Sequence, residues 1–162
     1  MNYEEGYGKI EEHFATHMSG TAKYIIGDTM ETSQYPIQDE PWVVLEVHPG
    51  ERKRISLGGS KVVFRYFAIV YNELFTRQKI EQLTLTDKVV DIFSSNQIEN
   101  ITIGEPTIKF LPKSNGWYPV TITHSAHWTS VLDNPVLDDV PDIFIPAYQF
   151  FNERNSQYMP LL

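Results

Sequence analysis

The sequence of 162 residues contains no cysteine. That absence excludes disulfide bonds, thiolate metal sites and cysteine nucleophiles, and it is compatible with folding in a reducing compartment. The sequence also lacks a long hydrophobic run, because the longest one, VVFRYFAIVY, is interrupted by Arg65 and is too short to span a bilayer. The first residues, MNYEEGYGKIEEH, show neither the basic start nor the apolar stretch of a signal peptide. We therefore expect a soluble intracellular protein without membrane contact.

Positive charge is also scarce. The formal net charge is −8 and the pI is about 5.0, whereas a protein that grips nucleic acid phosphates normally has a basic surface. Hydrophobic residues make up 41% of the chain and charged residues 21%, as in an ordinary globular domain with a real core. Nine Tyr, nine Phe, three Trp and ten Pro favour sheets and ordered loops over a helical bundle.

Two segments have helical spacing. Residues 9–18 place Ile10, Phe14 and either His17 or Met18 on one side, which predicts an amphipathic helix. A short turn is expected at 24–26, before Gly27 and an acidic, proline-marked loop. Residues 77–93, with Thr76 as a possible cap, predict a second helix. Its expected buried stripe consists of Ile80, Leu83, Val90 and Phe93.

Four segments predict strands. Residues 42–48 alternate between apolar and polar side chains, and 117–128 show a similar alternation. Residues 101–111 change the parity of their apolar side chains, which predicts a bulge or break near 104–106. Residues 61–71 are apolar on both faces, with Val62, Phe64, Tyr66, Ala68 and Val70 on one face and Val63, Phe67, Ile69 and Tyr71 on the other. A strand of this kind needs cover on both sides.

These segments predict an α+β fold in the order α-β-β-α-β-β. We expect one mixed or antiparallel sheet of about four strands with two helices packed on it, over residues 1–128. Residues 129–162 are rich in proline and aromatic side chains and have no clear period, so we interpret them as an extended C-terminal arm lying on a surface.

The histidines do not form a convincing metal site. His13 and His17 are four residues apart in the first helix, the spacing of a helical zinc motif. That motif needs a carboxylate directly after the first histidine, where this chain has Phe14, and also a third ligand. His124 and His127 leave opposite faces of a strand, so His124 is expected in the core and His127 at the surface. No P-loop, nucleophile elbow or dinucleotide motif is present, and we predict no enzyme, metal or cofactor.

The only basic cluster is ERKR at 51–54. It is either a charged loop tip or a contact with an acidic partner, which includes a second copy of this chain. The two-sided strand and the arm are surfaces that need a partner, and another copy is the simplest one. The predicted interface residues are Arg52, Lys53, Arg54, Phe67, Ile69, Phe150, Phe151 and Tyr158.

The order of elements has a further implication. A leading helix precedes a strand that starts at Pro-Trp, a Gly-Gly turn, a long apolar strand, a helix ending in Asp-Ile-Phe, and a Gly-Trp-Tyr-Pro-Val strand. In this order the chain resembles the tail terminator proteins of long-tailed bacteriophages. The matching stretches, which lie between about residue 9 and residue 128, are PWVVLEV, LGGSKVVFRYFAIVY, LTLTDKVVDIF and NGWYPVTITHSAHW.

The resemblance implies a structural virion protein. Tail terminators form hexameric rings that cap the tail tube, stop its polymerisation and meet the head-completion proteins of the neck, while DNA passes through the ring. It would place this protein at the tail–neck junction of the virion, and in the host cytoplasm during assembly. An acidic lumen would let DNA slide without sequence-specific binding, and we expect the first helix or Asp138–Asp139 to contribute to it.

Three alternatives stay open. A head-completion or connector protein of the same neck has a similar body. A small metal-dependent hydrolase would use His13, His17 and a distant carboxylate. An accessory domain would bind a peptide by strand addition at a sheet edge.

Overall fold

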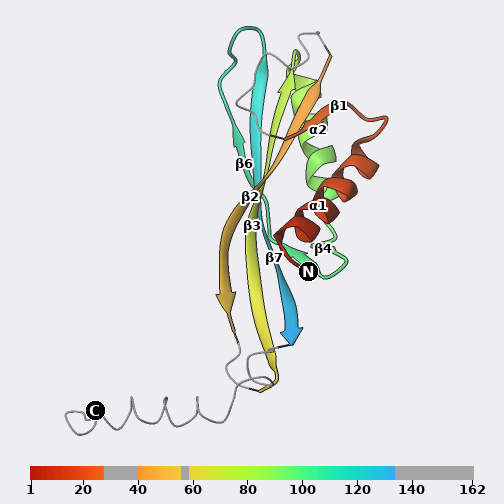
Figure 1. Cartoon of the computed structure of the whole chain (residues 1–162). Helices are drawn as coiled ribbons and strands as arrows, with labels where there is room; N and C mark the ends of the chain where they lie inside the picture. Colours follow the sequence, from red (N-terminus) through yellow and green to blue (C-terminus); the bar gives the residue numbers. More distant parts are fainter. Residues whose placement is uncertain (28–39, 56–58, 134–162) are drawn as a thin grey trace, which may run out of the picture. The chain divides into compact units, whose positions relative to one another are not determined.

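A computed structural model describes residues 1–27, 40–55 and 59–133 (Figure 1). The described elements are α1 (Tyr3–Met18), β1 (Lys23–Ile26), β2 (Trp42–Arg54), β3 (Lys61–Thr76), α2 (Lys79–Ile92), β4 (Gln97–Ile98), β5 (Ile101–Ile103), β6 (Thr107–Phe110) and β7 (Tyr118–Asp133). The chain divides into two compact units, of which the first comprises Met1–Lys53 and Phe64–Ser130 and the second Arg54–Val63 and Val131–Leu162. In the described part of the second unit, the amide of Ile55 donates a 2.9 Å hydrogen bond to the carbonyl of Val63.

Helix α1 begins earlier than the apolar spacing predicted. Asn2 caps it, because its side-chain oxygen accepts a 2.9 Å hydrogen bond from the amide of Glu5. The predicted stripe is confirmed: Ile10, Phe14 and Met18 are fully buried in the core. Each of these burials stabilises the fold by roughly 1.5–3 kcal/mol.

The α+β class is confirmed, but the sheet is larger than the four strands predicted. Among the described residues, seven strands form one mixed sheet in the order β1-β2-β3-β7-β5-β4, and β6 also pairs with β7. Strand β1 runs parallel to β2, with Lys23 opposite Trp42, where the sequence had predicted only a turn. The segment 101–111 is two strands, β5 and β6, and both run antiparallel to β7. The predicted break near 104–106 is therefore confirmed.

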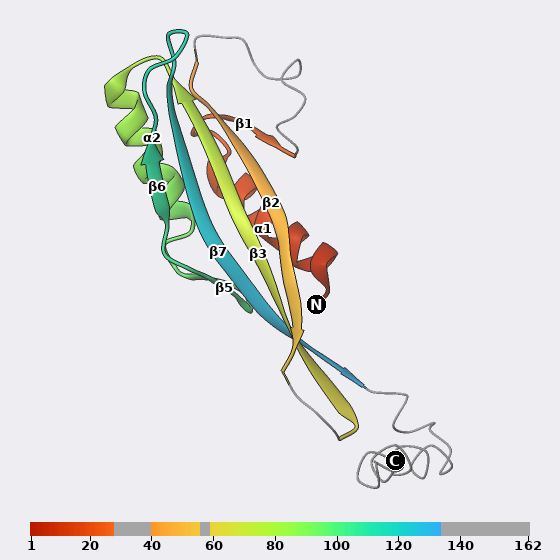
Figure 2. The same cartoon turned by 90° about the vertical axis from the view of Figure 1, so that its left-hand side faces the viewer.

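Strands β2 and β3 are longer than predicted. The basic run at 51–54 continues β2 instead of forming a loop tip, and β3 extends five residues beyond 71 to Thr76. The two faces of β3 differ: from Tyr66 to Thr76 the even-numbered residues are buried, while the odd-numbered residues are partly exposed, Ile69 the most at 41%. Helices α1 and α2 both lie on one face of the sheet (Figure 1). Figure 2 views the sheet from the other face, with the helices behind it.

The predicted buried stripe of α2 is only half right. Phe93 is buried and Val90 packs against the core, but the first two residues of the stripe face outward. Ile80 and Leu83 are 65% and 43% exposed. The helix buries instead the opposite side, which consists of Gln82, Leu85, Thr86, Val89 and Ile92. The apolar spacing indicated the wrong side of the helix because the side that is buried contains two polar residues, Gln82 and Thr86. Thr86 satisfies its hydroxyl locally by donating a 2.6 Å hydrogen bond to the carbonyl of Gln82. Thr76 does not cap the helix, whose N-cap is Gln78, although its hydroxyl donates to the Gln78 carbonyl.

Strand β7 carries the predicted alternation. Val120, Ile122, Ala126 and Trp128 are buried, and so is His124. The Trp128 ring stacks on Tyr66 with centroids 5.7 Å apart, and Gly6 of α1 lies directly against it. A Cβ atom at Gly6 would come within 2.3 Å of the Trp128 ring, so only glycine permits this close approach of helix and sheet.

Candidate interaction surfaces

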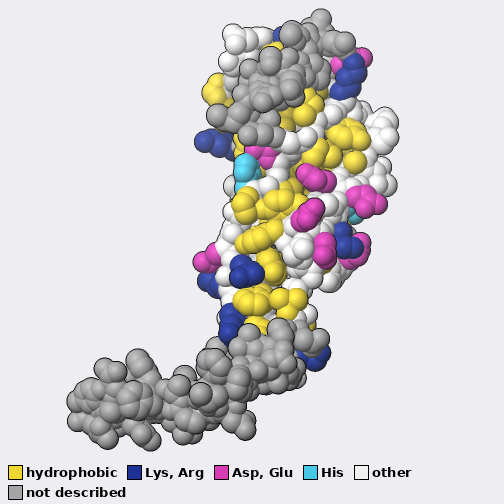
Figure 3. All heavy atoms as spheres, in the orientation of Figure 1, with side chains coloured by type: hydrophobic (Ala, Val, Ile, Leu, Met, Phe, Trp, Pro, Cys, Tyr) yellow, Lys and Arg dark blue, Asp and Glu magenta, His cyan; other side chains and the backbone are white. Residues whose placement is uncertain are grey.

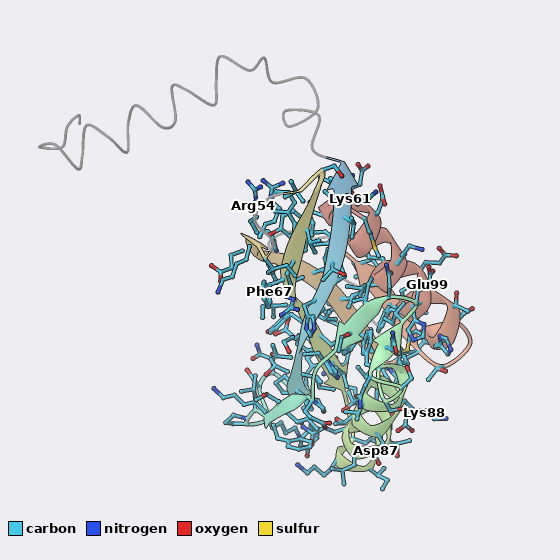
Figure 4. The ribbon with its side chains drawn as sticks, turned by 90° about the horizontal axis from the view of Figure 1, so that it is seen from below. Arg54, Lys61, Phe67, Asp87, Lys88 and Glu99 are labelled. Atoms are coloured by element: carbon cyan, nitrogen blue, oxygen red, sulfur yellow. The ribbon has the colours of Figure 1, made fainter. Side chains whose placement is uncertain are left out.

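The side of the sheet opposite the helices forms the first candidate surface. We call it the open face and define it by six alternate residues of β3, which are Arg65, Phe67, Ile69, Tyr71, Glu73 and Phe75. Ile69 is 41% exposed and the other five are partly buried. Figure 4 shows Phe67 on the side of the sheet away from α1 and α2. None of the described helices covers these side chains.

Beside this row, β7 presents small polar side chains. Thr102 of β5 pairs with His127 of β7, and Thr107 and Lys109 of β6 pair with Thr123 and Thr121. The ring of His127 lies 6.0 Å from that of Phe67, which places it on the open face. The short side chains of Thr121, Thr123 and Ser125 lie beside the aromatic residues of the open face. They leave room for another helix or strand to approach β3.

One end of the open face is an aromatic cluster. Trp42 stacks on Phe75 with centroids 4.2 Å apart, and Trp117 meets both rings edge-on. The guanidinium of Arg77 lies 3.7 Å from the centre of the Trp117 ring. This cluster fixes that end of the sheet through ring stacking and a cation–π contact.

The charges on the open face are separated along it. At one end, the Nε atom of Arg65 is buried without a hydrogen-bond partner among the described residues, and Lys53 Nζ lies 5.8 Å from the centre of the Phe67 ring. Further along β3, burial and the nearby Glu46 raise the pKa of the Glu73 carboxyl. Glu46 is itself 2.7 Å from His48 Nε2. The face therefore has a cationic end at Arg65, an apolar centre at Ile69 and an acidic region at Glu73.

The second candidate surface lies on α2. Its outer face, opposite the buried side, consists of exposed residues, which are Ile80, Leu83, Thr84, Asp87, Lys88 and Asp91. Figure 4 shows Asp87 and Lys88 on α2, on the other side of the sheet from Phe67. Beside Ile80, a groove of about 280 Å³ is lined by Ala22, Pro41 and Leu85 among others. Helix α2 thus presents apolar residues at its start and carboxylates toward its end.

The predicted interface residues are distributed over several places. Phe67 and Ile69 lie on the open face, and Lys53 lies near Phe67. Arg52 lies over Phe64 and Tyr66 instead, with 4.5 Å between its guanidinium carbon and the Phe64 ring centre. Arg54 belongs to the second unit. Phe150, Phe151 and Tyr158 lie outside the described residues, as do Asp138 and Asp139.

The two histidines of α1 are engaged with the backbone. His13 Nε2–H donates to the carbonyl of Ile92 at 2.8 Å, and His17 Nδ1–H donates to the carbonyl of His13 at 2.8 Å. Their rings are tilted by 40° to each other, with centroids 4.3 Å apart. One nitrogen of His13 therefore joins α1 to α2, and one nitrogen of His17 is bonded within α1.

His124 and His127 lie on opposite faces of β7, as predicted. His124 is 1% exposed and its ring lies 4.9 Å from that of Phe93. Burial lowers the pKa of this imidazole to about 4, so it is neutral at pH 7.

Two parts of this site were not predicted. The aromatic cluster was missed because the predicted strand ended at 71, before Phe75, although the period-2 pattern continues to Thr76. The outer face of α2 was missed because its apolar residues had been assigned to the core. The spacing of Gln82, Leu85, Thr86 and Val89 is the signal that identifies the buried side.

Comparisons with known proteins place the fold but no family. No family model and no curated protein matches the sequence. One solved chain is similar over 83% of this protein and 99% of its own length, with a TM-score of 0.55 and 9% sequence identity. At that identity the likeness extends to the fold alone. In the part of the chain that the structure describes, no helix is long and apolar enough to cross a membrane.

Proposed function

We propose that this protein is a structural component of the neck of a long-tailed bacteriophage, a terminator that forms a ring on the end of the tail tube. In this role it stops further addition of tube subunits and offers a surface to the head-completion proteins. The proposal has two supports. The sequence resembles tail terminators along most of its first 128 residues, and the chain has two unlike surfaces suited to self-association.

The observation that carries the proposal is the one-sided cover of the sheet. A layer of helices lies on one face, while the other face presents Phe67, Ile69 and Tyr71 without a described helix over them (Figure 2). Apolar sheet faces are normally buried against a second layer. Since the outer face of α2 is also partly apolar, each copy has two different surfaces that need a partner. Contacts between unlike surfaces generate rings when the rotation closes.

The charge of the chain fits a ring through which DNA passes. Glu4, Glu5 and Glu12 are exposed on α1, and Figure 3 shows Asp and Glu side chains gathered over that helix. We propose that α1 faces the lumen, where its carboxylates repel the phosphates and let DNA slide. Reversing these three charges to lysine should slow DNA ejection from assembled particles. Unchanged ejection would remove α1 from the lumen.

A tail-assembly assay tests the proposed function. Tube subunits of the cognate phage are polymerised with and without this protein, and tube lengths are measured by electron microscopy. We expect shorter tubes with a ring at one end, and hexamers by mass measurement. Rings that bind to the portal side of empty heads, and never to tubes, would identify a head-completion protein instead. Tubes of unchanged length without any bound protein would contradict both assignments.

A further inference from the structure

The two candidate surfaces are complementary to each other. Both have an apolar part and a charged part, and the cationic end of the open face is opposite in charge to the carboxylates of α2. The open face has Ile69 at its apolar centre and cations at Lys53 and Arg65. The outer face of α2 has Leu83 at its apolar start and the carboxylates of Asp87 and Asp91 further along, with Lys88 at its margin. We infer that α2 of one copy packs on the open face of the next copy, as the helical layer that this face lacks. The inference rests on the proposed ring assembly and names the surfaces that form it.

The spacing of the residues agrees on both surfaces. Leu83 and Asp91 are eight residues apart on a helix, which corresponds to about 12 Å at ~1.5 Å per residue. Ile69 and Arg65 are four residues apart on a strand, which corresponds to about 13 Å at ~3.3 Å per residue. A helix lying along β3 with Leu83 on Ile69 therefore brings Asp91 to Arg65.

The intermediate residue fits the same register. Asp87 is four residues from Leu83 and from Asp91, so it reaches the region of Phe67, where Lys53 Nζ is found. Lys53 is paired with Glu51 at 2.7 Å, but both side chains of that pair are mostly exposed, so exchanging this partner for Asp87 costs little. In the same register Ile80 extends toward Tyr71.

Arg65 gives the strongest indication of a partner. Its side chain is partly buried, and among the described residues its Nε atom has no hydrogen-bond partner and its guanidinium forms no ion pair. A cation in this position is stabilised when a carboxylate arrives with its own apolar surroundings. Asp87 and Asp91 have no ion pair among the described residues either. The contact would therefore give an ion pair to Arg65 and to the carboxylates of α2.

The contact is heterologous, because it joins unlike surfaces of two copies. Each copy gives its α2 to one neighbour and its open face to the other. Such contacts propagate beyond a dimer and close into a ring, whereas a contact between like surfaces would stop at two copies.

Cysteine cross-linking tests the inference directly, because the natural sequence has no cysteine. In the double variant Ile69→Cys/Leu83→Cys both positions are exposed, so the fold is kept, and circular dichroism verifies this. Under mild oxidation at high protein concentration we expect a ladder of covalent oligomers on a non-reducing gel, ending at the ring size. The matched control, Ile69→Cys/Thr16→Cys, carries its second thiol on exposed α1 and should give no ladder. Each single variant should give none either.

Charge exchange provides a second, independent test. Arg65→Glu and Asp91→Arg should each weaken self-association by about tenfold or more, measured by sedimentation equilibrium, and the combination should restore most of it. Rings that form without the specific ladder and without charge rescue would overturn this inference and leave the proposed ring function in place. A ladder that stops at the dimer would also overturn it. Protein that stays monomeric alone and on tail tubes would contradict the proposed function as well.

Discussion

The buried imidazole of His124 makes the stability of the protein depend on pH in a defined window. His124 lies against Phe93 in the core, and burial lowers the pKa of its ring from 6.5 to about 4. The unfolded chain therefore binds a proton at a higher pH than the folded chain does. The contribution of His124 to the free energy of unfolding is constant above about pH 6.5, falls as the pH decreases toward 4, and becomes level below that value.

The size of this effect follows from the two pKa values. Between pH 7 and pH 4.5 the linkage relation gives a loss of about 2 kcal/mol, since one pKa unit corresponds to ~1.4 kcal/mol. That is a large share of a typical stability of ~5–15 kcal/mol.

The assay is urea unfolding at several pH values, followed by the fluorescence of the three tryptophans. The control is His124→Leu, which keeps an apolar side chain in the core and removes the titrating group. Other titrating residues contribute to both proteins, so the difference between their pH profiles isolates His124. We expect the variant to lose about 2 kcal/mol less than the natural protein between pH 7 and pH 4.5. Identical pH profiles would refute a buried, neutral His124.

Three further predictions concern packing and charge. Gly6→Ala should lower stability by roughly 1–3 kcal/mol, because the added methyl meets the Trp128 ring, while Gly8→Ala, with open space around it, should raise stability by up to ~1 kcal/mol in thermal melts. Burial raises the pKa of the Glu73 carboxyl, so its charged form is disfavoured in the fold; Glu73→Gln should raise the melting temperature at pH 7, and this gain should fade as the pH falls through the raised pKa. A melting temperature that is unchanged by Glu73→Gln at pH 7 would contradict this prediction. Among the described residues the amide oxygen of Gln82 has no hydrogen-bond partner, and its NH2 group donates a long 3.5 Å hydrogen bond to the Pro119 carbonyl. Gln82→Met should therefore raise stability by ~1 kcal/mol in denaturant titrations, and a loss would show that the bond to Pro119 is needed.

The sequence was most informative where a period was long and regular. The stripe of Ile10, Phe14 and Met18 identified α1, while the long apolar run in β3 and the alternation in β7 identified the central strands. The apolar character of both faces of β3 also pointed to the open face before its position was known.

The remaining features depended on tertiary contacts that a local pattern does not contain. Strand β1 has only four residues, and its pairing with β2 comes from a distant part of the chain. Helix α2 buries Gln82 and Thr86 and exposes Ile80, so its apolar residues indicated the wrong side. When an apolar stripe faces outward, as here, the stripe itself can belong to an interface, and only the structure distinguishes that case from a core.

The central claim is that the open face is buried by a neighbouring copy in the assembled state. An electron cryomicroscopy reconstruction of the purified ring tests it most directly, by identifying what contacts Ile69. The account predicts helix α2 of the adjacent subunit at this position, with Leu83 against Ile69 and Asp91 beside Arg65. A ring in which Ile69 and Phe67 face solvent in every subunit would contradict it.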